Sequence, residues 1–240
     1  MNPIALSNKT TKIIAHRGLS GLETENTCAA FVAAGNRSYF GIETDIHLTT
    51  DGFFAVIHDD RTGRVSPTDL VVEQSTMEQL ASLVLYDKHN PKTMRSDLRI
   101  PTVQEYLSVC RYYEKTAVLE LKNPMPLEAI KNLVSVVQKQ SFIDETIFIS
   151  FHYENLLYLR SVFPQCHVQF LTSEWSEDVV RELGQQKMGL DIHYGCLNEY
   201  RVAFAHDMGV EVNCWTCDSE AEAYRLMDMG VDYITSNILE

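Results

Sequence analysis

The sequence predicts an α/β fold of the (β/α)8 TIM-barrel type, and three observations favour that fold class. Short apolar runs alternate with helical segments from one end of the chain to the other. Most of these runs are apolar on both faces, which is typical of parallel strands covered by helices. The chain has 240 residues, which is enough for a complete set of strand–helix units. We therefore expect residues 1–240 to form a single barrel domain.

Several segments have the composition of strands. They are 12–16, 41–49, 54–58, 117–122, 146–151, 167–172, 188–193, 210–216 and 231–236. This is one more than the barrel requires. Because Asp51-Gly52 is a strong hairpin signal, we expect 54–58 to run back antiparallel to 41–49, as an excursion after the second strand. A doubly wound sheet is the alternative, but neither of the glycine-rich nucleotide-binding motifs of such sheets occurs in the chain.

The helices between these strands have recognisable ends. Ser75, Thr102 and Ser219 are each followed three residues later by a glutamate, which predicts capping boxes. Gly209 and Gly230 each lie between a helical segment and the next strand, where a glycine commonly ends a helix.

The composition limits the possible partners. The formal net charge is −13, which argues against nucleic acid or an anionic membrane surface as the main partner. The N-terminal residues lack the apolar segment of a signal peptide, and no later run is long enough for stable insertion into a bilayer. We therefore expect a soluble, cytoplasmic protein. The six scattered cysteines predict reduced thiols rather than a disulfide framework, and the oligomeric state stays open.

The predicted hairpin carries unusual side chains. Glu43 and Asp45 lie two positions apart on one strand, so their side chains share a face. If Asp51 and Gly52 are the two turn residues, Asp45 lies directly opposite His58, where cross-strand side chains come into contact. The hairpin then returns a histidine to a pair of carboxylates.

Two other strands end in charged residues. His16 and Arg17 lie at the end of the first strand, and Glu120 and Lys122 share a face at the end of 117–122. The carboxyl ends of barrel strands are the positions that carry catalytic groups. Three carboxylates near two histidines and two cations predict a metal and phosphate site. Oxygen ligands favour Mg²⁺ or Ca²⁺ over zinc.

A series of motifs extends these observations. It consists of AHRG (15–18), ETENT (23–27), IETDIHLTTDG (42–52), VIHDD (56–60), IPTVQEYL (100–107) and LELK (119–122). In this order the motifs resemble the glycerophosphodiester phosphodiesterase family, densely over residues 13–122 and more weakly afterwards. The resemblance implies a metal-dependent (β/α)8 enzyme that hydrolyses a small-molecule glycerophosphodiester to an alcohol and sn-glycerol 3-phosphate.

The resemblance also implies roles for individual residues. The metal ligands are Glu43, Asp45 and Glu120, the acid–base pair is His16 and His58, and the phosphate contacts are Arg17 and Lys122. Trp215, near the end of a later strand, is either a wall residue or an apolar platform under the glycerol. The chain departs from the family pattern at Thr24, where proline is usual, and at Thr235-Ser236, where Thr-Asp is usual.

Two other functions are compatible with a barrel of this kind. A related phospholipase would cleave inositol lipids or sphingomyelin at a membrane, but we find no basic or aromatic docking segment in this acidic chain. A non-catalytic ligand-binding barrel would be expected to have lost a histidine or a carboxylate, and all five of those residues are present. The sequence does not decide which histidine is the acid, or whether water or the substrate's own hydroxyl attacks first.

Overall fold

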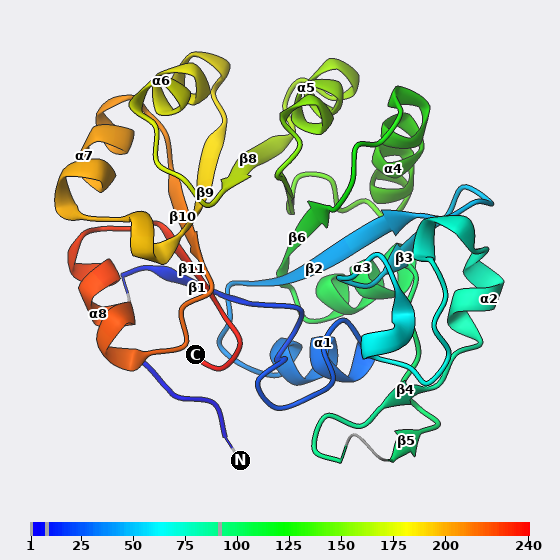
Figure 1. Ribbon diagram of the computed structural model, residues 1–240. Helices are drawn as coiled ribbons and strands as arrows, with labels where there is room; N and C mark the ends of the chain where they lie inside the picture. Colours follow the sequence, from blue (N-terminus) through cyan, green and yellow to red (C-terminus); the bar gives the residue numbers. More distant parts are fainter. Residues whose placement is uncertain (1, 8–9, 91–92) are drawn as a thin grey trace.

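The centre of the molecule is a closed ring of parallel strands (Figure 1), in a computed structural model that describes residues 2–7, 10–90 and 93–240. The strands of the ring are β1 (Lys12–Ala15), β2 (Gly41–Leu48), β6 (Thr116–Leu121), β7 (Thr146–Ser150), β8 (His167–Thr172), β9 (Gly189–His193), β10 (Val212–Trp215) and β11 (Tyr233–Ser236). Because β1 pairs with both β2 and β11, the ring has no open edge. The predicted (β/α)8 barrel is confirmed.

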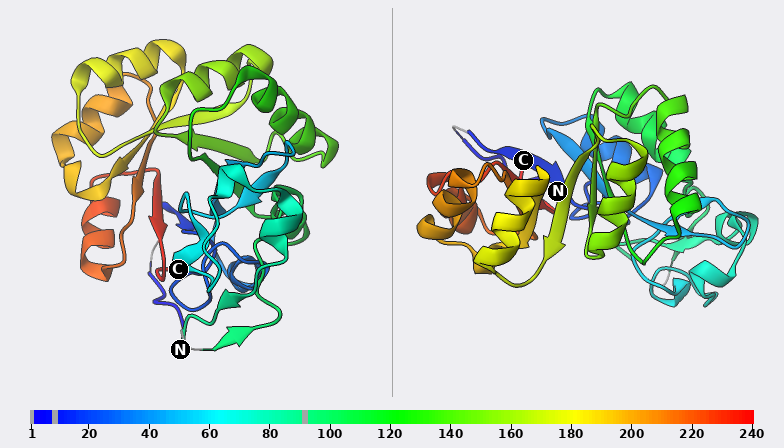
Figure 2. Two further views of the ribbon diagram at one scale, coloured as in Figure 1. Left: turned by 45° about the vertical axis from the view of Figure 1, so that its right-hand side comes forward. Right: turned by 90° about the horizontal axis from the view of Figure 1, so that it is seen from above.

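Helices surround the ring, as the views in Figures 1 and 2 show. They are α1 (Cys28–Gly35), α3 (Val103–Tyr112), α4 (Leu127–Lys139), α5 (Tyr153–Val162), α6 (Glu177–Gln186), α7 (Glu199–Asp207) and α8 (Glu220–Asp228). Within the described ranges, no helix is both long and apolar enough to cross a lipid bilayer.

Alternation along each strand divides the core into two parts. In β9, Leu190 and Ile192 join the large apolar cluster between the strands and the helices, so Asp191 between them points into the barrel. A second cluster fills the lower interior with side chains from five strands, namely Ile14, Val118, Ile147, Ile149, Leu171 and Tyr233. This apolar layer separates the polar groups at the carboxyl ends of the strands from a second polar group nearer the amino ends, in which Gln169 contacts Asn213 and Glu211.

The hairpin after β2 forms, but the predicted register is wrong by one residue. β3 (Phe54–Val56) pairs antiparallel with β2, and His47 lies opposite Ala55. The turn has three residues instead of two, because Thr49 and Phe53 form the last backbone pair and Gly52 takes a left-handed φ of +80°. Asp45 therefore pairs with Ile57, whose backbone N donates to the Asp45 carbonyl at 3.1 Å, and His58 lies one position further on.

The helix ends agree with the sequence in most places. Thr102 forms the predicted capping box with Glu105, and Gly209 and Gly230 both have positive φ after their helices. The box predicted at Ser75 forms one residue later, where Thr76 caps α2 (Met77–Ala81) together with Gln79. Thr76 is the residue with the free hydroxyl, because the Ser75 hydroxyl donates to the Val71 carbonyl instead.

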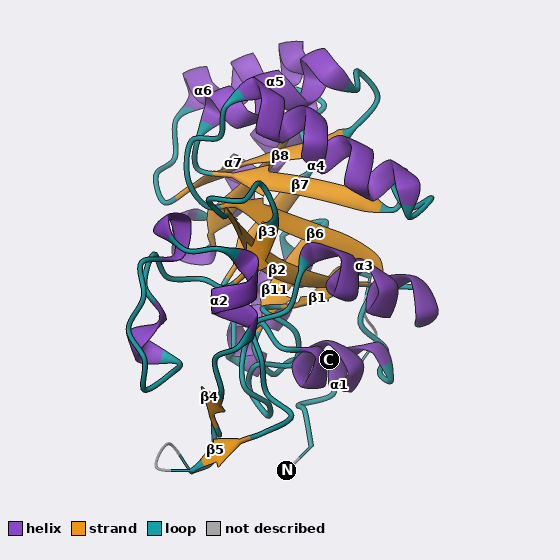
Figure 3. Cartoon of the chain, turned by 90° about the vertical axis from the view of Figure 1, so that its right-hand side faces the viewer, coloured by secondary structure: helices purple, strands orange, loops and turns teal. Residues whose placement is uncertain are grey.

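The segment between β3 and α3 forms a small unit beside the barrel (Figure 3). It contains two 3₁₀ turns, η1 (Thr62–Arg64) and η2 (Val72–Gln74), and α2. It also contains a two-stranded sheet of β4 (Leu85–Tyr86) and β5 (Met94–Arg95) that the sequence did not predict. Its own apolar cluster, which includes Ile57, Leu80 and Leu98, fixes the segment that carries His58.

Candidate active site

Three carboxylates meet where the middle of β2 lies beside the carboxyl end of β6. Glu43 and Asp45 share the inner face of β2, and the register of the sheet sets Asp45 beside Glu120. All three are buried, and each offers an oxygen within 4.8 Å of an oxygen of the other two. The sequence predicted this cluster, because positions two apart on a strand share a face.

The three carboxylates disfavour one another's ionisation. Burial and the Asp45 charge raise the pKa of Glu43 well above its ordinary value, and the same two causes raise the pKa of Glu120 to about 7. Burial also opposes ionisation of Asp45, but the charges of Lys122 and Arg17 outweigh it and lower the Asp45 pKa. One carboxylate of the cluster is thus stabilised as an anion, while its two neighbours tend to keep a proton.

The unsatisfied oxygens of this cluster fit a hard divalent cation. Glu43 Oε1 and Asp45 Oδ1 are buried and accept no hydrogen bond from the described part of the chain. Buried acceptors without partners are costly, and a cation bound by all three carboxylates would satisfy them. The donor set consists only of oxygens, which Mg²⁺ and Ca²⁺ prefer.

Two cations flank the carboxylates. Arg17 Nε lies 3.3 Å from Asp45 Oδ2, and Arg17 Nη1 donates to Glu25 Oε1 at 3.0 Å. Lys122 Nζ donates to Glu120 at 2.7 Å and lies 3.4 Å from Asp45 Oδ1. Both side chains are partly exposed to the cavity, so they can contact an anion there.

The turn after β1 fixes the position of Arg17. Arg17 has a left-handed φ of +54°, and its backbone N donates to Glu43 Oε2 at 2.7 Å. Gly18 follows with φ +73°, and a Cβ at this position would lie 2.7 Å from Ala30. The HRG motif thus combines a charged residue with the one residue type that fits the close approach of α1.

His16 is held by a chain of side chains from the end of β11. Asn237 Nδ2 donates to Asp218 Oδ2 at 2.6 Å, which fixes the orientation of the amide. The amide oxygen of Asn237 accepts a hydrogen bond from the Ser20 hydroxyl and lies 2.8 Å from His16 Nδ1. An amide oxygen only accepts, so the Nδ1 of His16 carries the proton and Nε2 is free to accept one. Burial and the neighbouring Arg17 charge lower the pKa of His16, which keeps the ring neutral.

His58 has a carboxylate behind it. Its Nδ1 lies 2.6 Å from Asp59 Oδ1, and Arg64 and His58 together lower the pKa of Asp59 to about 2. Burial lowers the pKa of His58, as do the charges of Arg17 and Lys122, while the Asp45 charge and the hydrogen bond with Asp59 oppose this shift. The buried ring of His47 supports the segment from below, with Nε2 3.2 Å from the His58 carbonyl oxygen.

One cavity of about 230 Å³ connects these groups. Its lining includes the predicted residues His16, Arg17, Glu43, His58, Glu120, Lys122 and Trp215. Asp45 is buried next to this group. The prediction that His58 approaches the carboxylates is confirmed even though the register is wrong, because the chain leaves the strand after Val56 and an irregular segment carries the ring to the cavity.

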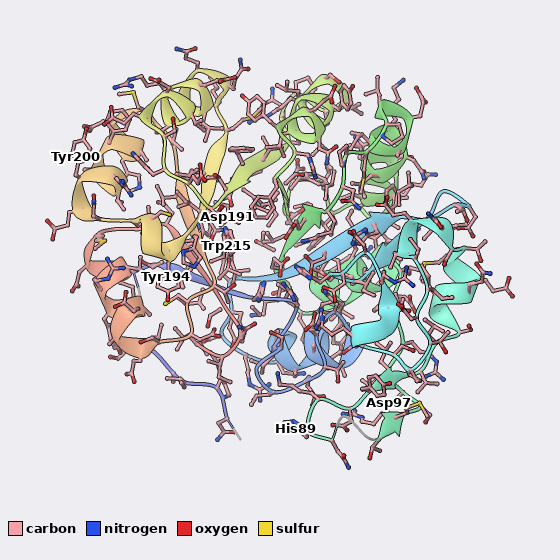
Figure 4. The ribbon with its side chains drawn as sticks, viewed as in Figure 1. His89, Asp97, Asp191, Tyr194, Tyr200 and Trp215 are labelled. Carbon is pink, nitrogen blue, oxygen red and sulfur yellow. The ribbon has the colours of Figure 1, made fainter. Side chains whose placement is uncertain are left out.

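Three supporting residues were not singled out in the sequence. Asn26, with φ +54°, donates to Asp45 Oδ2 at 2.8 Å and thereby orients that carboxylate. Asn237 orients His16, as described above. Asp191 lines the cavity from β9, and Figure 4 shows it near Trp215 inside the ring of helices. Asn26 lies in the ETENT motif, whereas no motif marks the other two.

Comparisons with known proteins agree with this geometry. The model of the glycerophosphoryl diester phosphodiesterase family matches residues 16–239. The chain is 30% identical over 231 residues to YhdW of Bacillus subtilis strain 168, a protein provisionally named as a glycerophosphodiester phosphodiesterase, with 94% of this chain and 93% of YhdW covered.

Solved structures of similar proteins share the fold. A phosphodiesterase of Oleispira antarctica, solved in complex with its product sn-glycerol-3-phosphate, superposes with a TM-score of 0.86 at 27% identity, covering 94% of this chain and 92% of the other. A glycerophosphodiester phosphodiesterase of Parabacteroides distasonis superposes with a TM-score of 0.77 at 26% identity, covering 99% and 94%.

Proposed function

The chain belongs to the glycerophosphoryl diester phosphodiesterase family, and we propose that it hydrolyses glycerophosphodiesters to an alcohol and sn-glycerol 3-phosphate. The observation that carries this proposal is the convergence of a carboxylate cluster, two cations and two histidines on one small cavity. A cavity of about 230 Å³ suits a small polar diester better than a lipid with acyl chains.

Glu43, Asp45 and Glu120 would hold a divalent metal, Mg²⁺ or Ca²⁺. When bound, the metal neutralises negative charge on the phosphate group, which otherwise repels an attacking oxygen. The two cations act on the same group. Lys122, which also contacts Glu120, and Arg17 hold the phosphate and stabilise the charge that builds on its oxygens in the transition state.

The two histidines divide the proton transfers between them. His16 takes a proton at Nε2 from the attacking group, which is either water or the substrate's own hydroxyl, because Asn237 keeps the proton of the neutral ring on Nδ1. His58 donates a proton to the oxygen of the leaving alcohol as the phosphorus–oxygen bond breaks. Burial lowers the pKa of His58, and the Asp59 carboxylate behind the ring opposes that shift by stabilising the protonated form that this role requires.

A substrate panel tests the proposed function. The purified protein is incubated with glycerophosphocholine, glycerophosphoethanolamine, and vesicles of phosphatidylinositol or sphingomyelin, and release of glycerol 3-phosphate or of the lipid headgroup is measured. We expect turnover of the two water-soluble diesters, loss of activity in excess chelator, and recovery with Mg²⁺ or Ca²⁺. Cleavage of the lipids alone would contradict the substrate class. Full activity in chelator, with no metal in the protein, would contradict the role of the metal.

A further inference from the structure

Arg64 binds two carboxylates at once. Its Nε donates to Asp59 Oδ2 at 2.5 Å, and its Nη1 and Nη2 donate to the two carboxylate oxygens of Glu25 at 2.9 and 2.8 Å. Every nitrogen of the guanidinium group therefore has a carboxylate partner. Because the guanidinium is planar and its N–H groups have a fixed arrangement, Arg64 also fixes the position of one carboxylate relative to the other.

Each of these carboxylates also contacts a residue of the proposed active site. Glu25 Oε1 accepts a hydrogen bond from Arg17 Nη1 at 3.0 Å, and Asp59 Oδ1 lies 2.6 Å from His58 Nδ1. Carboxylates and basic side chains thus alternate along one chain of contacts, and its arginine contacts are charge-assisted. The chain runs in the order Arg17, Glu25, Arg64, Asp59 and His58.

This chain of contacts joins two parts of the molecule that pack separately. Arg17 and Glu25 lie between β1 and α1, whereas Asp59 and Arg64 lie in the small unit after β3 (Figure 3). The small unit has its own apolar cluster, which holds the backbone before His58. Within the described ranges, the His58 ring forms a hydrogen bond only with Asp59, so the orientation of the ring follows that of this carboxylate.

The exposure of Arg64 indicates that it matters more for geometry than for stability. Its side chain is 46% exposed, and those of Asp59 and Glu25 are 30% and 22% exposed. Ion pairs at the surface contribute little to the free energy of unfolding. A bidentate arginine nevertheless restricts the rotation of the carboxylate that it binds. Loss of Arg64 should thus disturb the site more than the fold.

We infer that Arg64 is a positioning residue that holds the proton donor His58 and the phosphate-binding Arg17 in a fixed relation. It acts on His58 through Asp59, and on Arg17 through Glu25. This inference rests on the proposed function and specifies how the two parts of that site are aligned. The hydrogen bond from Arg64 is the main cause of the low pKa of Asp59, about 2, so this carboxylate stays charged near neutral pH.

Steady-state kinetics separate the two effects of Arg64. Arg64→Gln should lower kcat for glycerophosphocholine about 10–100-fold, since a small misplacement of a catalytic group costs up to about 10²-fold. With the p-nitrophenyl diester of glycerol phosphate, the loss of kcat should shrink to about twofold, because that leaving group needs no proton. Glu25→Gln should mainly raise KM, because it loosens Arg17 and leaves the contact of Asp59 with Arg64 in place.

Arg61 provides a matched control. It lies in the same small unit and forms a bidentate pair with Asp69, at 2.9 and 2.7 Å, that stays within this unit. Arg61→Gln should therefore leave kcat and KM unchanged within about twofold, and both arginine variants should unfold at nearly the same urea concentration. Arg64→Lys keeps the charge but cannot span both carboxylates, so it should recover only part of the lost kcat. Full recovery in Arg64→Lys, or an equal loss in Arg61→Gln, would overturn the inference.

Two measurements without turnover separate this inference from the proposed function. Calorimetry with inorganic phosphate in the presence of Mg²⁺ reports on Arg17, and the proton NMR signal of the hydrogen bond between His58 and Asp59 reports on the proton donor. We expect Arg64→Gln to weaken phosphate binding about threefold or more and to broaden this signal, whereas Arg61→Gln changes neither.

The possible outcomes are distinct. If the wild type hydrolyses no glycerophosphodiester and Arg64→Gln still weakens phosphate binding and broadens the signal, only the proposed function fails. If the wild type hydrolyses glycerophosphocholine and Arg64→Gln keeps its turnover, its phosphate affinity and its proton signal, only the positioning role fails. If Arg64→Gln does not fold, the inference is decided by Arg64→Lys and Glu25→Gln, and wild-type values of kcat, KM and phosphate affinity in both would overturn it.

Discussion

At the scale of single residues, the groups behind the two histidines differ in kind. His16 has a neutral amide, Asn237, against its Nδ1, whereas His58 has the carboxylate of Asp59. A carboxylate stabilises an imidazolium, and an amide oxygen only orients a neutral ring. The difference supports His16 as the base and His58 as the acid.

Replacement of each histidine by alanine tests these roles. His16→Ala and His58→Ala should each lower turnover of glycerophosphocholine by about 10²–10⁴-fold, the usual contribution of a positioned acid or base, and should leave metal binding intact. With p-nitrophenol as the leaving alcohol, His58→Ala should recover much of its rate, because this leaving group needs no proton, whereas His16→Ala should not. Recovery by His16→Ala instead would reverse the assignment, and near-normal turnover by both variants would refute the two-histidine mechanism.

The raised pKa of Glu120 predicts how metal affinity depends on pH. A metal ligand must be deprotonated, and Glu120 keeps its proton up to a pH of about 7 before metal binds. We therefore expect the affinity for Mg²⁺ or Ca²⁺ to fall as the pH is lowered through about 7, with protons released on binding. Calorimetry in buffers of different ionisation enthalpy measures this release. An affinity that is constant between about pH 6 and 8 would contradict the raised pKa.

At the scale of elements, the hairpin shows what sequence signals can and cannot specify. Asp51-Gly52 correctly predicted a hairpin, but the same dipeptide fits both a two-residue and a three-residue turn. The hydrogen bonds of Thr49 with Phe53 close the longer turn. The turn also has a partner outside the hairpin, because Thr50 N donates to the Ser75 carbonyl. The register was therefore outside the reach of local sequence reasoning.

Gly18 and Gly52 both have positive φ, so their alanine variants distinguish the cost of backbone strain from an effect on the site. Gly52 has φ +80° and open space where a Cβ would project, while at Gly18 a Cβ would lie 2.7 Å from Ala30. Gly52→Ala should cost about 1–2 kcal/mol of unfolding free energy, from backbone strain alone, with activity retained. Gly18→Ala should cost more and should also lower activity, because Gly18 N donates to the Glu43 carbonyl. Urea unfolding and glycerophosphocholine turnover measure both effects, and equal behaviour of the two variants would contradict this interpretation.

At the scale of the whole molecule, the carboxylate cluster should couple metal binding to stability. A ligand that binds only the folded state at about 100 times its dissociation constant stabilises it by about 2.7 kcal/mol, and in a chain of this size that raises the melting temperature by about 5–10 °C. We expect such a shift with Mg²⁺ or Ca²⁺ for the wild type and for Glu128→Gln, which changes an exposed helix residue. Glu43→Gln should lose most of the shift, together with activity. A shift that persists in Glu43→Gln would place the metal elsewhere.

The barrel itself was predictable, because alternating apolar strands and capped helices repeat along the whole chain. The clustering of Glu43, Asp45 and Glu120 was predictable for a similar reason, since strand spacing determines which side chains share a face. The contact of Asn237 with His16 was not predictable. It depends on the pairing of β11 with β1, and that pairing is a property of the complete barrel.

The ring closes between its first and last strands, and this has a consequence for synthesis on the ribosome. The three carboxylates are all translated by residue 120, but Asn237, which orients His16, follows β11 near the end of the chain. Proteins emerge with their N-terminal part first, so a half-translated chain carries the acidic residues of the site without the amide that directs the base. We therefore expect hydrolytic competence to arise only after the segment that carries Asn237 has been translated and β11 has docked against β1.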